Sequence, residues 1–129
     1  TQLGDATAQS GDCVRRSGVS PQNTPATSIW FGQVSNDPGH RSPPHHHEHC
    51  ETGGYVLKGH GRIYFGDDYQ EFVDVHEGDF VFVPPFMKHV EVNMSTTDEL
   101  IWLTCRTPDN LVTNFDDVPD EQLQGYHRA

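Results

Sequence analysis

The feature that most constrains the fold is the spacing of short apolar segments between turn residues. Segments such as 28–34, 80–83 and 99–105 are rich in Val, Ile, Leu, Phe and Trp, and clusters of Gly, Pro, Asn and Asp separate them. No long stretch has the 3.6-residue period of an amphipathic helix. Short strands with turns roughly every eight to twelve residues are typical of a sandwich or barrel. The sequence therefore predicts an all-β fold, in which segment 80–83, apolar at every position, is covered on both sides.

Length, charge and cysteine content exclude several classes of protein. The chain has 129 residues, which suits one domain, and a net charge of −11. Nucleic acids and anionic membranes would be repelled by that charge, and no apolar run approaches the ~20 residues of a membrane span. We therefore expect neither as a partner. Three widely spaced cysteines form no disulfide framework, and the N-terminus lacks the features of a secretory signal, so we expect a cytoplasmic location.

The segment 39–51 carries the strongest chemical signal in the chain. Four of the nine histidines lie between positions 45 and 49, directly after two prolines that disfavour a helix. Alternate side chains of an extended strand share one face. That face would carry His45, His47, His49 and Glu51. Several imidazoles and a carboxylate converging in this way predict a site for a divalent metal ion.

A second segment, 78–93, supplies partners for the first. Its last part alternates, so that His89, Glu91 and Asn93 share one face of the predicted strand. We expect His89 to join the histidines of the first segment at one metal ion. Glu91 is a candidate catalytic residue that would orient a ligand or move a proton, and an outer salt bridge is its alternative role.

Together the two segments resemble the two conserved motifs of the cupin family. Positions of the first motif are occupied by Gly39, His45, His47, Glu51 and Gly59, with one extra residue between the last two. Positions of the second motif are occupied by Gly78, Pro84, His89 and Asn93, with Phe86 where the family has glycine. The resemblance implies a small double-stranded β-barrel, or jelly roll, at 27–108. An N-terminal arm at 1–26 would precede it, and a solvated acidic tail at 109–129, with one short helix at 119–124, would follow.

The same resemblance implies a set of metal ligands. It makes His45, His47, His89 and a fourth residue the ligands of one divalent ion, with zinc preferred and Fe(II), Mn or Ni as alternatives. The extra residue before Gly59 leaves the fourth ligand open between Glu51 and His49. Aligned backwards from that glycine, the acid of the family would fall on Thr52, which is a poor ligand.

Three functions are compatible with such a site. The first is a zinc-dependent polyketide cyclase, which promotes aldol cyclisation and dehydration of a poly-ketone or aromatic precursor in biosynthesis. The second is an iron-dependent dioxygenase acting on an aromatic or diketone substrate, and the third is a cupin that only binds a small ligand. Many aromatic residues predict an apolar pocket and an apolar or aromatic small-molecule substrate. Tyr64 is a second candidate catalytic residue, as a donor to a developing oxyanion, and the resemblance also implies a homodimer.

Overall fold

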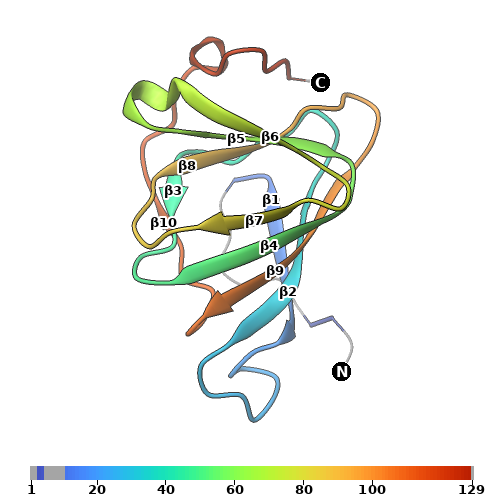
Figure 1. The fold of residues 1–129 in the computed structure, drawn as a ribbon, viewed down its shortest axis with the longest axis vertical. Helices are drawn as coiled ribbons and strands as arrows, with labels where there is room; N and C mark the ends of the chain where they lie inside the picture. The colour runs from blue at the N-terminus through green and yellow to red at the C-terminus, as the bar shows by residue number, and fades with distance from the viewer. Residues whose placement is uncertain (1–2, 5–10, 129) are drawn as a thin grey trace.

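The computed structural model describes residues 3–4 and 11–128, and it consists of two facing antiparallel sheets (Figure 1). The first sheet has the order β1 (Cys13–Val19), β2 (Trp30–Asn36), β9 (Leu100–Thr107), β4 (Glu51–Lys58) and β7 (Phe80–Val83). The second has the order β10 (Thr113–Asn114), β3 (His45–His46), β8 (His89–Asn93), β5 (His60–Phe65) and β6 (Glu71–His76). Two short 3-10 turns, η1 (Asp67–Tyr69) and η2 (Asp120–Gln122), complete the elements. The all-β prediction is confirmed.

Alternation along the strands explains how the two sheets enclose a core. In β9 every second side chain, from Leu100 to Arg106, is buried between the sheets. The neighbouring strand β2 alternates in the same way. The core between the sheets is formed by Cys13, Trp30, Val34, Val56, Ile63, Val75, Leu100 and Trp102. Burial of these side chains in one contiguous cluster supplies the main driving force for closing the barrel.

Strand β7 departs from the sequence prediction. Val81 and Val83 line the barrel interior, whereas Phe80 and Phe82 are 83% and 60% exposed. The prediction that segment 80–83 is covered on both sides was wrong, because β7 is the last strand of its sheet and nothing in the described chain packs over its outer face. The periodicity of an all-apolar segment cannot distinguish a strand that is covered on both faces from a strand that is covered on one.

The C-terminal segment covers the outer side of the second sheet (Figure 1). Leu123 and Tyr126 are buried there against Tyr64, Val90 and Val92. The expectation of a solvated tail was therefore wrong for the segment as a whole, because two apolar side chains hold it against the barrel, although Asp116, Asp117 and Glu121 are exposed as expected. The short helix expected at 119–124 appears as the single turn η2. Among the described residues, no helix has the length and hydropathy that a membrane crossing requires.

The N-terminal segment contributes a full strand to the first sheet. β1 pairs with β2 along its length, with one irregularity between Ser17 and Val19. Its alternation buries Cys13, Arg15 and Ser17 on the side that faces the barrel interior. Arg15, which lies in the segment predicted to be an arm outside the barrel, thereby reaches the centre of the barrel.

Candidate metal centre

Four buried side chains meet in the barrel interior. They are His45, His47, His89 and Glu91, and their ligand atoms all lie within 4.8 Å of one another. His45 on β3 pairs directly with His89 on β8, and strand alternation puts Glu91 on the same face as His89. The structure thus brings together the three histidines that the two sequence segments suggested.

Each of the three imidazoles is oriented by a backbone carbonyl. The Nδ1 atoms of His45, His47 and His89 lie 3.0, 2.9 and 2.8 Å from the carbonyl oxygens of Pro43, Leu111 and Met87. A carbonyl oxygen only accepts, so each Nδ1–H donates, and in its neutral form each ring presents the lone pair of Nε2 to the interior. This is the arrangement that orients histidine ligands at metal sites.

The carboxylate of Glu91 faces two of these lone pairs. Its Oε1 atom lies 3.2 Å from Nε2 of His89 and 3.3 Å from Nε2 of His45. An imidazole lone pair and a carboxylate oxygen repel each other unless a cation offsets the repulsion. The guanidinium of Arg15, with Nη2 3.7 Å from Oε1, supplies one positive charge at the edge of the cluster, and a proton or a metal ion between the facing atoms would supply another. The donor set and its geometry therefore fit a divalent cation.

The protonation states at the cluster suit the same role. Burial, with a contribution from the neighbouring His89, lowers the pKa of His45 to about 3. Burial and the charge of Arg106 also hold the pKa of His47 well below its ordinary value. Burial alone would raise the pKa of Glu91, but the adjacent side chains of His45 and His89 and the positive charge of Arg15 outweigh it and hold this pKa well below its ordinary value. Neutral imidazoles and an ionised carboxylate are the forms that bind a metal ion.

Two buried arginines, Arg15 and Arg106, complete the cluster, and no motif in the sequence pointed to either. Nη2 of Arg15 lies 3.2 Å from Nε2 of His45, and Nη2 of Arg106 lies 3.0 Å from Nε2 of His47. Burial lowers the pKa of Arg106 to about 9, which leaves its guanidinium charged near neutral pH. Strand alternation could have identified Arg106, because it continues the inward-facing series of Leu100, Trp102 and Thr104 along β9.

Neither His49 nor Glu51 is brought into the cluster. Both are exposed, and the chain turns between them and the histidines, with a hydrogen bond from the Cys50 N–H to the His47 carbonyl oxygen and a positive φ of 54° at Glu48. This turn ends the alternation that a continuous strand would have kept. Thr52, which follows Glu51, is buried, and its hydroxyl accepts a hydrogen bond from Nε of Arg106. The carboxylate at the centre is that of Glu91.

Tyr64 is also placed outside the cluster. It alternates with Ile63, which lines the interior, and its hydroxyl donates to the carbonyl oxygen of Gln124 in the C-terminal segment. The expectation that Tyr64 stabilises an oxyanion is not met, because its side chain lies on the other side of the second sheet.

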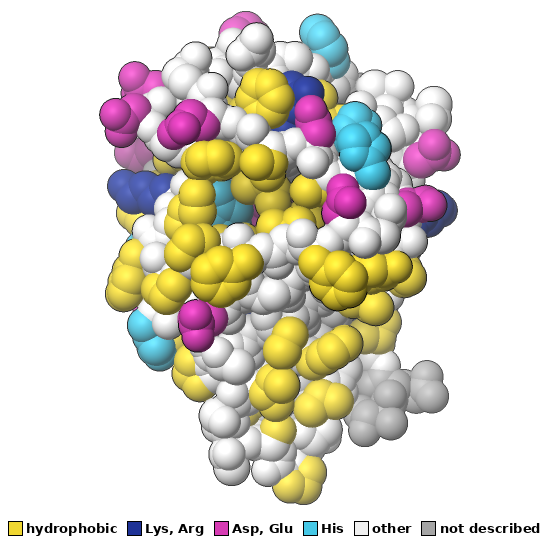
Figure 2. Space-filling view, in the orientation of Figure 1, with side chains coloured by type: hydrophobic (Ala, Val, Ile, Leu, Met, Phe, Trp, Pro, Cys, Tyr) yellow, Lys and Arg dark blue, Asp and Glu magenta, His cyan; other side chains and the backbone are white. Residues whose placement is uncertain are grey.

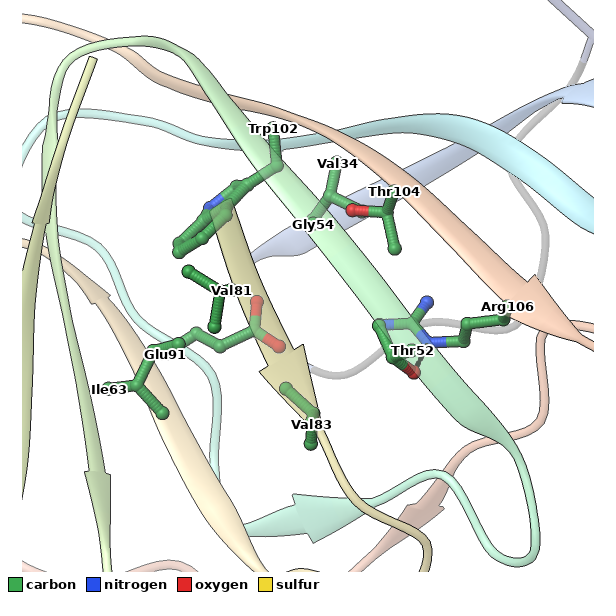
Figure 3. Close-up of a pocket in the computed structure, with 10 residues that line it drawn as sticks. All are labelled: Val34, Thr52, Gly54, Ile63, Val81, Val83, Glu91, Trp102, Thr104 and Arg106. Carbon is green, nitrogen blue, oxygen red and sulfur yellow. Dashed lines mark hydrogen bonds between the residues drawn. The ribbon is translucent and has the colours of Figure 1, made fainter. Parts of the chain in front are cut away.

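Space beside the cluster is divided between a small cavity and an outer hollow. The cavity, about 20 Å³, lies between Glu91 and Arg106 (Figure 3) and holds roughly one water molecule. The hollow, about 270 Å³, reaches His89 and has an apolar lining that includes Phe65, Val73 and Phe82. In Figure 2, hydrophobic side chains surround a depression on the β7 side of the molecule, and a histidine is visible inside it. The walls shared by cavity and hollow are Ile63, Val81 and Val83.

These features define a double-stranded β-barrel with a buried candidate metal centre at its core. The chain belongs to the cupin family, since the cupin domain model matches residues 32–105. No curated protein matches the chain.

Solved structures share the fold at low sequence identity. An uncharacterized conserved protein with a double-stranded beta-helix domain from Klebsiella pneumoniae is 16% identical with a TM-score of 0.68, over 87% of this chain and 91% of that one. The polyketide cyclase RemF from Streptomyces resistomycificus is 17% identical with a TM-score of 0.71, over 95% and 86%. Oxalate decarboxylase from Bacillus subtilis is 18% identical with a TM-score of 0.70, over 94% of this chain but 33% of its own.

Proposed function

We propose that this chain is a metal-dependent enzyme that acts on a small carbonyl-bearing molecule. The observation that carries the proposal is the convergence of three oriented Nε2 lone pairs with the carboxylate of Glu91 in a buried interior. His45, His47, His89 and Glu91 would hold the ion, with zinc as the first choice and Fe(II), Mn or Ni as alternatives. When bound there, a divalent ion supplies Lewis-acid polarisation of a ligand oxygen.

The surroundings support a substrate with an apolar or aromatic body. The hollow beside His89 is lined by apolar side chains, which would exclude water from the reacting carbonyl. The guanidinium of Arg106 would stabilise negative charge as it develops on the carbonyl oxygen. These residues favour aldol ring closure and dehydration of a poly-ketone or aromatic precursor. The similarity in fold to a polyketide cyclase is compatible with this reaction class.

An iron-dependent dioxygenase is the second candidate, and Glu91 is the observation that favours it. A carboxylate among the ligands lowers the charge of the site and suits iron or manganese better than an all-histidine set would. One of the solved structures of similar fold concerns Mn(II) centres in oxalate decarboxylase. The dioxygenase would use the same hollow for an aromatic or diketone substrate.

Metal analysis followed by two assays separates these candidates. Protein purified without chelator should contain about one divalent ion per chain. Zinc together with ring closure of a linear poly-ketone supports the cyclase. Ferrous iron together with oxygen uptake on aromatic or diketone compounds supports the dioxygenase. Metal and ligand binding without turnover in either assay would instead identify a cupin that only binds, and chains without metal would contradict the proposal as a whole.

A further inference from the structure

Arg106 is a buried cation whose hydrogen-bond partners are all neutral. The residue is 3% exposed, and its Nε and Nη1 atoms donate to the Thr52 hydroxyl and the Asn110 side-chain carbonyl at 3.0 and 2.8 Å. Its Nη2 atom donates to Nε2 of His47. By contrast, Arg41 and Arg62 form ion pairs with aspartates. Within the described part of the chain, no carboxylate lies at ion-pair distance from Arg106.

An unpaired buried charge is costly, and buried charges in proteins are generally paired. The third hydrogen bond of Arg106 also competes with metal binding, because it uses the Nε2 lone pair of His47 that the metal ion would use. A metal ion bound to Nε2 of His47 would leave Nη2 of Arg106 without its hydrogen-bond acceptor. Thr52 and Asn110 would still hold the other two nitrogens, so the guanidinium would stay in place with a donor facing the cavity.

We propose that Arg106 forms a binding subsite for an anionic oxygen, of a carboxylate or an enolate, and that this anion and the metal ion bind cooperatively. The proposal rests on the metal centre of the proposed function. The anionic oxygen would lie in the cavity between Arg106 and Glu91 (Figure 3), where it gives Arg106 both a counter-charge and an acceptor. Binding is reciprocal, so the metal ion would strengthen anion binding by the same factor.

The cavity also limits the shape of the ligand. At about 20 Å³ it takes an oxygen-bearing head and not a whole substrate. Ile63, Val81 and Val83 line both the cavity and the apolar hollow, so the body of the ligand would extend along these side chains into the hollow. The predicted ligand class is therefore a molecule with an anionic oxygen at one end and an apolar body.

The coupling can be measured as zinc affinity of the metal-free protein by titration calorimetry. Titrations are run in sodium formate and in sodium chloride at equal ionic strength, and again with hexanoate or with hexanol. We expect formate to tighten zinc binding by about tenfold or more, hexanoate to act at lower concentration, and hexanol to have no effect. Arg106→Gln should bind zinc at least as tightly as wild type in chloride, and formate should not change its affinity.

Controls separate the subsite from the metal centre itself. Arg128→Gln, at an exposed arginine, should retain the full formate effect. Circular dichroism checks folding, and if Arg106→Gln is unfolded, Arg106→Lys should show a reduced formate effect. Zinc binding by wild type without any formate dependence, or a formate effect that persists in Arg106→Gln, overturns the subsite and leaves the metal centre of the proposed function intact. Absence of zinc binding by wild type overturns both.

Discussion

Phe86 illustrates how one backbone conformation explains a departure from the family motif. Its φ is +57°, in the left-handed region, where a side chain beyond glycine costs roughly 1–2 kcal/mol. The motif has glycine at this position. Phe86 is 61% exposed and contacts His46 edge-on, so little burial offsets the strain.

We therefore expect Phe86→Gly to stabilise the protein by about 0.5–1 kcal/mol, as measured by chemical denaturation. Val14→Gly is the matched control, because Val14 is also exposed but lies in the extended strand β1, where glycine costs about 0.5–1 kcal/mol. Equal destabilisation by the two substitutions would show that the left-handed backbone of Phe86 carries no strain.

Three histidines of the cluster could be predicted from the sequence, but the fourth residue could not. His45, His47 and His89 could be predicted because strand alternation and motif spacing both point to them. The fourth position could not, because the turn at Glu48–Cys50 resets the alternation before Glu51. A positive φ at a glutamate is set by the folded surroundings and leaves no mark in the sequence.

Among the elements, the C-terminal segment is held by a buried arginine as well as by Leu123 and Tyr126. Arg41 is 3% exposed at its side chain and pairs with Asp117 and Asp120 at 2.9 and 2.8 Å. Arg128 pairs with the same Asp120. The segment therefore closes over the second sheet partly through ion pairs of its aspartates. From the acidic composition alone, these aspartates were expected to stay in solvent.

This contact predicts a pH dependence of stability. Hydrogen bonds from Arg128 and Arg41 lower the pKa of Asp120 from its ordinary value of 3.8. A carboxyl with a lowered pKa stabilises the fold above the ordinary value, and this stabilisation is lost as the pH falls through the folded-state value. Asp120→Asn should cost about 1 kcal/mol in the free energy of unfolding at neutral pH, and the difference from wild type should shrink below about pH 4.

Glu121→Gln is the matched control for Asp120→Asn, since Glu121 is the adjacent acid and is exposed. It should leave the free energy of unfolding nearly unchanged at every pH. A pH-independent difference between Asp120→Asn and wild type would contradict the charged contact.

Elements that the sequence predicted well are those with clear alternation, such as β2, β8 and β9. Strand β1 was harder to predict, since the segment around Cys13–Val19 is polar and two arginines interrupt it. Its place in the sheet depends on pairing with β2, a contact between distant segments that local propensity does not contain.

For the whole molecule, the oligomeric state stays a prediction, as does the cytoplasmic location. The outer face of the first sheet has an uncharged hollow of about 320 Å³, lined by Phe31, Gly53, Gly54, Tyr55, Phe80, Val81, Leu103 and Cys105. Two copies of a chain with a net charge of −11 repel each other, so an uncharged apolar face is where a second copy meets least repulsion. We expect a homodimer through this face.

Light scattering after size exclusion should give the mass of two chains for wild type and of one chain for Phe80→Asp. Val73→Asp places a charge on an exposed residue of the other sheet and should remain dimeric. A monomeric wild type, or a dimer that tolerates Phe80→Asp, would contradict this interface.

All the functions proposed for this chain depend on one divalent ion held in the barrel by three histidines and Glu91. Zinc affinity of Glu91→Gln compared with Glu51→Gln tests it most directly, because both substitutions remove one carboxylate and only Glu91 lies in the cluster. We predict that Glu91→Gln weakens zinc binding by roughly a hundredfold or more, while Glu51→Gln binds as wild type. If Glu51→Gln bound zinc weakly and Glu91→Gln bound zinc with wild-type affinity, Glu91 would not be the metal ligand.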